Sequence, residues 1–297
     1  MDAFSPSQLF LSPILAEVRA TTLFTDEGLG AYITNSCFVA VLVLGLILYM
    51  AKKATTKMTL IPHKWQNGFE MVIEFLYDRV EAIVGKKQAP RAFPLLATLF
   101  IFILVSNYFG LLPGVGTIGW GDGPGFFTVD HMERPLLRPA TADLNMTLGM
   151  ALCFMLIWTV LTIRELGVWG FLVHTFGPKG KVENVFIQVF LVIVFFGVGI
   201  IELVGFAFRP VSLSLRLFGN IYAGETLLHT MSNLGTMFGL GSTGQFILSL
   251  VAPLPFYFME LLVGLLQAMV FTLLCAVYIQ LSTSHDDHGE EHGDAHH

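Results

Sequence analysis

Charged residues are scarce in this sequence of 297 residues: they make up 13% of the chain, against roughly 25% in an average soluble domain. Short segments that alternate polar and apolar residues, which are typical of membrane β-barrels, are also missing. Hydrophobic residues make up 54% of the chain, and the mean hydropathy is +0.70. We therefore expect an all-α integral membrane protein, with the lipid bilayer as its surroundings.

Basic residues form no stripe that could neutralise a row of phosphates, which excludes nucleic acid as a partner. The net charge of −6 depends on the C-terminus, because five acids lie in the last sixteen residues and the remainder carries −1. Cysteine is also rare, and Cys37, Cys153 and Cys275 lie in apolar runs, where cysteine usually behaves as a small hydrophobic residue. The sequence thus predicts no disulfide, no metal site and no cofactor.

Both ends of the sequence are polar. Residues 1–27 lack the basic start and apolar core of a signal peptide, and we expect them to form an extramembrane segment. The tail, 282–297, contains five histidines and five acids in SHDDHGEEHGDAHH. This composition can bind metal, but a disordered, solvated tail is the favoured interpretation. The membrane domain is then 28–281.

Apolar runs long enough for the roughly 20 residues of a spanning helix predict spans over 28–51, 92–112 and 142–163. Thr141 and Asp143 are suited to cap the third span. Two further apolar regions, 184–233 and 245–281, are too long for upright spans. The first has about fifty residues and would extend roughly 75 Å as one helix, against a bilayer core of about 30 Å. The first region is either two spans or one strongly tilted helix. Two overlong neighbours favour a tilted pair.

An amphipathic helix is predicted over 62–87, between Pro62 and the turn at Gly85. Its apolar residues recur at steps of three and four, and its acids face away from them: Trp65, Phe69, Val72, Leu76, Val80 and Ile83 against Glu70, Glu74, Asp78 and Glu81. Such a helix either packs on protein or lies in the headgroup plane, and the closely flanking spans favour the interfacial position. Eight lysines and arginines between Lys52 and Arg91 predict a cytoplasmic location for this segment and an N-terminus outside.

Only five formal charges occur between Asn184 and Leu281: Glu202, Arg209, Arg216, Glu225 and Glu260. Each would cost roughly 2.5 to 3.5 kcal/mol at the middle of a membrane, so a functional role is expected. At about 100° per residue, Glu202, Arg209 and Arg216 share one helix face, and Asn220 follows a turn later. The small residues Ser212, Gly219 and Ala223 lie near this face and would let another helix approach closely. Glu225 points to the opposite side.

On the last helix, Glu260 and Gln267 share a face, and antiparallel packing could bring that face against Glu225 or Arg216. The result would be a polar path through apolar helices, with His229 either joining it or lying at the membrane edge. Ion pairing that only fixes helix packing is the alternative, and Arg209, next to Pro210, could equally reach toward an interface. A guanidinium keeps its charge under nearly any condition. Arg216 can therefore attract a mobile carboxylate and repel a passing proton.

A secondary transporter with a charged binding site at mid-membrane is an alternative function. Many such transporters contain paired, interrupted helices in their two halves. Nothing before residue 170 mirrors the arginine-containing stretch, which disfavours this alternative.

The stretch SLRLFGNIYAGE, residues 214–225, resembles the signature of subunit a, the membrane stator of F-type ATP synthases, and SNYFGLLPG and PATADLN upstream extend the resemblance. It implies that Arg216 faces a ring of c subunits between two aqueous half-channels. Asn220, Glu225, Gln267 and Glu202 match further family positions. Many relatives have a histidine at the position of Glu260, whereas mitochondrial relatives resemble this chain at that position.

The same resemblance implies that the chain is not an enzyme by itself but couples proton flow to rotation of the c-ring and to ATP synthesis. It implies as partners the c-ring, the b-subunit peripheral stalk and other ATP synthase subunits. It also implies one tilted helix for each overlong region, which gives about five crossings, and a C-terminus in the cytoplasm. The expected location is a bacterial inner membrane.

Overall fold

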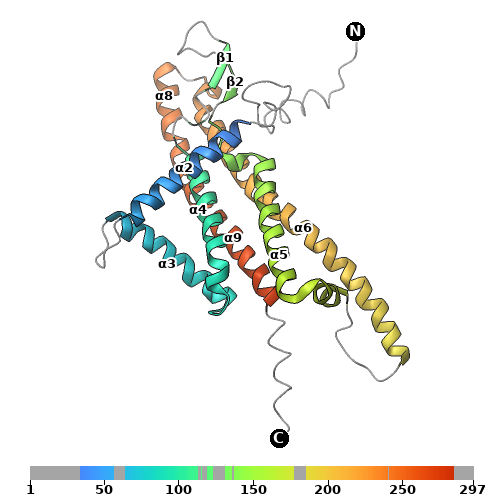
Figure 1. Ribbon diagram of the computed structural model, residues 1–297. Coiled ribbons are helices and arrows are strands. Elements are labelled where there is room, and N and C mark those ends of the chain that lie inside the picture. The colour runs from blue at the N-terminus through green and yellow to red at the C-terminus, as the bar shows by residue number, and fades with distance from the viewer. Residues whose placement is uncertain are drawn as a thin grey trace, which may run out of the picture.

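The chain forms a bundle of long helices, shown in Figure 1, and the computed structural model describes residues 34–56, 64–112, 115, 119–122, 131–135, 137–176, 185–239 and 241–283. The expected segment 1–27, the start of the first expected span and most of the polar tail lie outside these residues. The helices are α2 (Asn35–Thr55), α3 (Lys64–Val84), α4 (Ala89–Gly110), α5 (Leu144–Phe176), α6 (Val185–Ser232), α7 (Leu234–Met237), α8 (Ser242–Val251) and α9 (Pro253–Thr283), with a 3₁₀ turn, η2, at Ala140–Ala142.

Five stretches of the described chain are long and apolar enough to cross a membrane: Asn35–Thr55, Ala89–Gly110, Leu144–Arg164, Val194–Ser232 and Ser242–Gln280. The prediction of an all-α membrane protein with about five crossings is confirmed. An odd number of crossings places the start of α2 and the end of α9 at opposite ends of the bundle, as Figure 1 shows.

The interior joins α3, α4, α5, α6 and α9. Phe100 on α4, Phe154 on α5, Leu217 on α6 and Phe271 on α9 are almost completely buried in one apolar cluster. Alanines at positions 97, 151, 268 and 276 belong to the same cluster. Small residues let helix backbones approach closely, which matters in lipid because helix association there depends on van der Waals packing and not on the exclusion of water.

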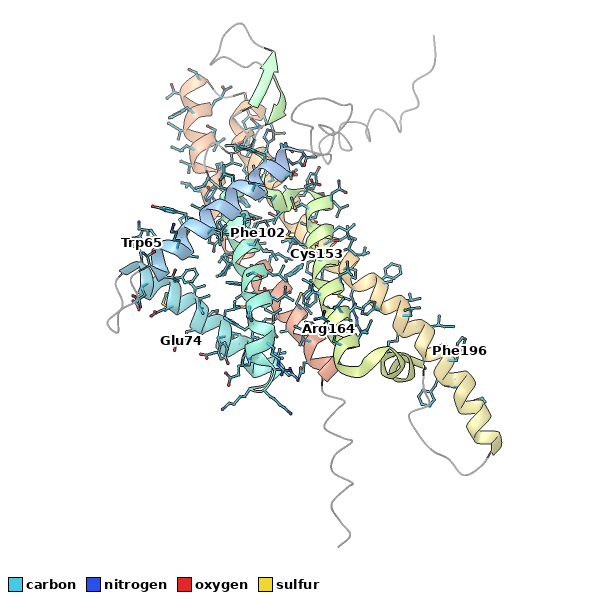
Figure 2. The ribbon with its side chains drawn as sticks, viewed as in Figure 1. Trp65, Glu74, Phe102, Cys153, Arg164 and Phe196 are labelled. Carbon is cyan, nitrogen blue, oxygen red and sulfur yellow. The ribbon has the colours of Figure 1, made fainter. Side chains whose placement is uncertain are left out.

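Helix α3 has two apolar surfaces. Leu76 and Val80 are fully buried in the core, whereas Trp65 and Met71 are exposed. The Lys53 ammonium, from the last turn of α2, lies 4.4 Å from the centre of the Trp65 ring. Figure 2 shows Trp65 at the N-terminal end of α3. The helix therefore packs on protein along one row of side chains, and its location in the headgroup plane stays a prediction.

The N-terminus of α5 is capped as expected by Asp143, whose Oδ1 accepts a hydrogen bond from the Asn145 amide at 3.0 Å. Thr141 does not share this role, because it lies in the preceding 3₁₀ turn. Helix α5 also continues beyond the expected end at 163. It bends at Gly167, where φ is +72°, a left-handed conformation that glycine adopts without steric strain.

The region expected over 184–233 is one helix of 48 residues, α6, in spite of Pro210. It runs obliquely across α5 in Figure 1 and also packs against α9. The region expected over 245–281 starts earlier, at Ser242, and is divided at Ala252 into α8 and α9. Pro253 and Pro255 have no amide hydrogen to donate, so the hydrogen-bond ladder is interrupted there.

A small antiparallel sheet lies beyond the end of α4, at the bundle end that also carries α8 (Figure 1). Strands β1 (Gly119–Asp122) and β2 (His131–Pro135) pair Gly119 with Pro135 and Asp122 with His131. The sequence analysis did not predict these strands.

Candidate functional site

Contacts between α6 and α9 define an antiparallel register. Arg209 meets Tyr278, and Asn220 meets Gln267. One turn farther along α6, Gly224 lies against Glu260. Residue numbers rise on α6 as they fall on α9, so the two helices pack antiparallel. The polar face of α9 meets α6 at Asn220 and Gly224.

The centre of this interface is a hydrogen bond from Asn220 Nδ2 to Gln267 Oε1, 2.8 Å long. Gln267 is only 4% exposed. Its Nε2 has no hydrogen-bond partner within the described residues. An amide in this state retains a donor for a further polar group or for water.

Glu260 is equally buried, at 4% exposure. Its carboxyl group lies directly on the backbone of Gly224, where any side chain larger than a hydrogen atom would overlap it. The Oε1 atom has no hydrogen-bond partner in the described ranges. Glycine at position 224 is therefore what leaves room for this acid between the helices.

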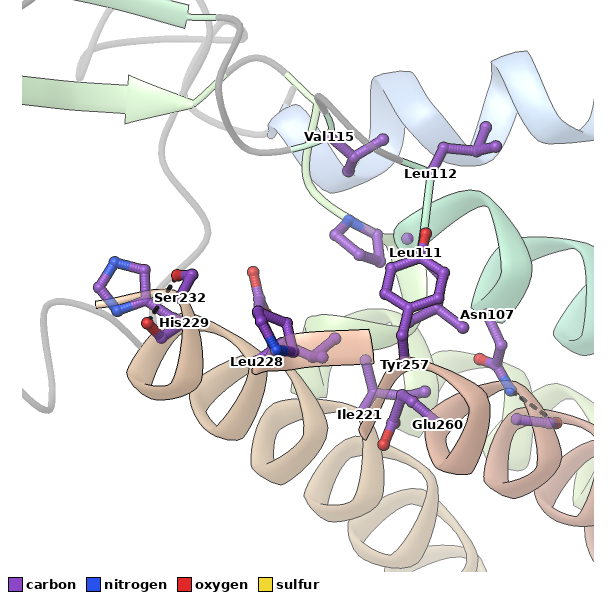
Figure 3. A pocket seen from close by; sticks show the side chains of 15 residues that line it. Asn107, Leu111, Leu112, Val115, Ile221, Leu228, His229, Ser232, Tyr257 and Glu260 are labelled. Atoms are coloured by element: carbon purple, nitrogen blue, oxygen red, sulfur yellow. Dashed lines mark hydrogen bonds between the residues drawn. The ribbon is translucent and has the colours of Figure 1, made fainter. Parts of the chain in front are cut away.

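A pocket of about 380 Å³ opens beside Glu260, where α4 and α6 end and α9 begins. Figure 3 shows Tyr257 and Glu260 near its centre, with His229 and Ser232 toward one end. Its polar lining residues come from three helices: Asn107, Glu225, His229, Ser232, Tyr257 and Glu260. The remaining lining is mostly apolar, but a cavity of this size is large enough for several water molecules, to which these polar side chains offer hydrogen bonds. Two acids and a histidine thus border one compartment at one end of the bundle.

Asn107 links the pocket to α4. Its Nδ2 donates to the Gly264 carbonyl oxygen at 3.1 Å, and the side chain is 2% exposed. Sequence reasoning did not select Asn107, Tyr257 or Gly224. An amide inside a predicted span was the available signal for Asn107. Tyr257 and Gly224 gave no such signal, because their roles depend on the α6–α9 register.

Arg216 lies outside the pocket, on the exposed surface of α6, beside the half-exposed Leu215. The contacts at 209 and 220 place Phe271, which is 1% exposed, at the level of Arg216 on α9. Within the described part of the chain, its guanidinium has no hydrogen bond, ion pair or ring contact. A charge in this position has no internal counter-charge among those residues.

Glu202 and Glu225 lie on opposite sides of Arg216 along α6. At 1.5 Å per residue, Glu202 is about 21 Å away and Glu225 about 14 Å away. Glu202 is half-buried, Ser212 is exposed one turn from Arg216, and Arg209 packs over the Tyr278 ring. The structure therefore gathers Glu225, Glu260 and His229 at one pocket and separates them from Arg216 and Glu202. Within the described ranges, no three His, Cys, Asp or Glu residues form a group that could hold a metal ion.

These features define a multi-pass α-helical membrane protein with a pocket bordered by two acids and a histidine at one end and an isolated cation on a long helix. The family model described as ATP synthase A chain matches residues 33–280. The chain belongs to this family.

Three relatives show the extent of the similarity, and all are named ATP synthase subunit a. The protein of Protochlamydia amoebophila is 33% identical over 82% of this chain and 78% of its own length. That of Azorhizobium caulinodans is 33% identical over 88% and 92%. That of Anaeromyxobacter dehalogenans is 32% identical over 84% of this chain, which spans only 57% of that longer relative. The name describes a subunit of an ATP synthase and not a complete enzyme, in agreement with the expectation from the sequence.

Proposed function

We propose that this chain is the stator subunit that passes protons to and from a rotating ring of c subunits, and so couples proton flow to ATP synthesis. The observation that carries the proposal is Arg216, a permanent cation on an exposed, largely apolar helix surface without an internal counter-charge in the described residues. Such a charge is costly in lipid, so a partner with an acidic group is expected to cover it.

The pocket bordered by Glu225, His229 and Glu260 is the proposed entry half-channel. It lies at the end of the bundle where α4 ends, which the distribution of lysine and arginine predicts to be outside the cytoplasm. Protons would pass along its acids and reach a carboxylate on a c subunit. Once neutral, that carboxyl group can face lipid during rotation at far lower cost than the charged form.

The part of α6 on the other side of Arg216, near Glu202, is the proposed exit half-channel to the cytoplasm. A c-subunit carboxyl group that arrives there loses its proton and then pairs with Arg216. Because a guanidinium neither accepts nor releases a proton at physiological pH, Arg216 blocks direct passage between the half-channels. Each proton that crosses 100 mV supplies about 2.3 kcal/mol. Asn220 and Gln267 would complete the polar surface next to Arg216.

Partners of the chain are then other ATP synthase subunits: the c-ring at the exposed α6–α9 surface and the b-subunit peripheral stalk. The proposed location is the bacterial inner membrane, with the N-terminus outside and the C-terminus in the cytoplasm. The exposed apolar side chains on α2, such as Val41 and Leu48, suit contact with lipid.

Replacement of Arg216 tests the proposal in inverted membrane vesicles that contain the whole complex. We expect Arg216→Ala to abolish ATP-driven proton pumping while the complex still assembles, and Arg216→Lys to fail nearly as completely. The control is Arg164→Ala, at an exposed arginine on α5, which should pump normally. Normal pumping by Arg216→Ala would refute the proposal. Saturable uptake of a solute by the chain without its ring would favour a secondary transporter instead.

A further inference from the structure

A second arginine on α6, Arg209, is held in an unusual way. Its guanidinium lies 4.8 Å from the centre of the Tyr278 ring on α9 and 6.0 Å from that of Phe206 on its own helix. Within the described residues it has no ion pair. Aromatic rings attract a cation through their negative faces but carry no net charge. The rings therefore fix Arg209 in place but do not neutralise its positive charge. A carboxylate in the same position would neutralise it.

Trp158 on α5 contacts both of these aromatic residues. The Trp158 ring packs against Phe206 with 5.0 Å between ring centres. Its Nε1 donates a hydrogen bond to the Tyr278 carbonyl oxygen at 3.0 Å. Trp158 is 6% exposed and belongs to the apolar core. The position of Arg209 is thus defined by three helices and not by a flexible surface contact.

Arg209 lies between Arg216 and Glu202 on the same face of α6, seven residues from each, or about 10 Å along the helix axis. On α9, the ionisable side chain in contact with Arg209 is that of Tyr278, and the acid of that helix, Glu260, lies eighteen residues before Tyr278. On α5, residues 144–163 contain no Asp, Glu, His, Lys or Arg. No acid on a facing helix of that part of the chain offsets the charge.

We propose that Arg209 is a second fixed positive charge of the proton path, which promotes proton release on the exit side. The electric field of this charge weakens proton binding by an acid of the exit half-channel, such as Glu202, or by a c-subunit carboxyl group that passes this level of α6. Tyr278, Phe206 and Trp158 are the positioning residues for this charge. The inference rests on the proposed function, because it assumes that protons leave along this part of α6.

The test measures ATP-driven pumping by the whole complex in inverted vesicles as a function of the pH on the cytoplasmic side. During ATP hydrolysis, protons are taken up from that side. Loss of the charge in Arg209→Gln should let uptake continue at higher pH. Two unit charges about 10 Å apart at an effective dielectric constant near 20 predict an upward shift of the alkaline limb by roughly one pH unit. Arg209→Lys keeps the charge and should keep the wild-type profile.

Two further comparisons separate this role from a structural one. Tyr278→Leu removes the ring and should shift the profile in the same direction, whereas Tyr278→Phe retains the ring and should not; this pair gives the answer if Arg209→Gln does not assemble. Arg164→Gln, on α5, controls for the general surface potential and should produce no shift. An unshifted profile in Arg209→Gln, or an equal shift in Arg164→Gln, overturns the inference. Pumping by Arg216→Ala would instead refute the proposed function itself.

Discussion

Asn220 on α6 donates a hydrogen bond to the buried amide oxygen of Gln267 on α9, at 2.8 Å. This contact joins the two helices one turn beyond Arg216. It lies between Arg216 and the pocket at Glu260. In lipid, few alternative partners exist for a buried amide, so this contact contributes to both helix packing and the polar path.

A double-mutant cycle should detect that contact. We expect Asn220→Ala and Gln267→Ala each to destabilise the complex, because the remaining amide loses its partner, at a cost of about 1 to 3 kcal/mol. The double variant should be less destabilised than the sum of the two, with a coupling of about 0.5 kcal/mol or more. Thermal unfolding of the detergent-solubilised complex measures these effects. Strict additivity would show that the two side chains do not interact.

Gly224→Ala should impair pumping without preventing assembly. The added methyl group would overlap the Glu260 carboxyl group, which has to move from its position against α6. Gly197→Ala is a matched control on the same helix, since a methyl group there would meet nothing within 4 Å. Pumping rates of the two variants in vesicles provide the comparison. Equal rates would show that the position of Glu260 does not affect proton entry.

Glu260→Gln should slow proton entry strongly, because the amide keeps the size of the side chain but can no longer accept and release a proton. Loss of a positioned proton-transfer group typically lowers a rate by about 100-fold or more. Passive proton flux through the membrane sector, measured over a range of pH, reports the effect. Ser249→Ala, at a hydroxyl that only bonds the Phe246 carbonyl of its own helix, is the control. Flux equal to wild type at every pH would remove Glu260 from the path.

The two surfaces of α3 predict different responses to truncation. Leu76→Ala removes a fully buried side chain and should cost about 2 to 5 kcal/mol of stability. Met71→Ala on the same helix removes a side chain that is 65% exposed and should cost far less. Heat-induced aggregation of the purified complex compares them. Similar losses would mean that the outer surface of α3 is also packed against a partner.

The sequence was sufficient to predict the spanning helices, because their apolar length depends only on bilayer thickness. It also predicted the shared face of Glu202, Arg209 and Arg216, which follows from helical periodicity. Hydropathy could not decide between one long helix and two spans over 184–233, and only the continuous α6 decides it. The break at Ala252 was not predicted, although Pro253 and Pro255 were visible.

The contacts of the site required the fold. The pairing of Asn220 with Gln267 and of Arg209 with Tyr278 depends on the antiparallel register of two helices separated by a turn. The pocket also needs Asn107 from α4, more than a hundred residues away in the sequence. The strands β1 and β2 pair across residues that carry no alternating pattern. Such long-range contacts leave little signal in a single sequence.

The most direct test of the central claim is a map of the assembled complex at a resolution that shows side chains. We predict that the Arg216 guanidinium faces the c-ring and approaches the carboxylate of one c subunit to about 4 Å or less, the range of an ion pair. A map in which Arg216 instead points into lipid or bulk solvent, away from any acidic group of the ring, would contradict the proposed mechanism.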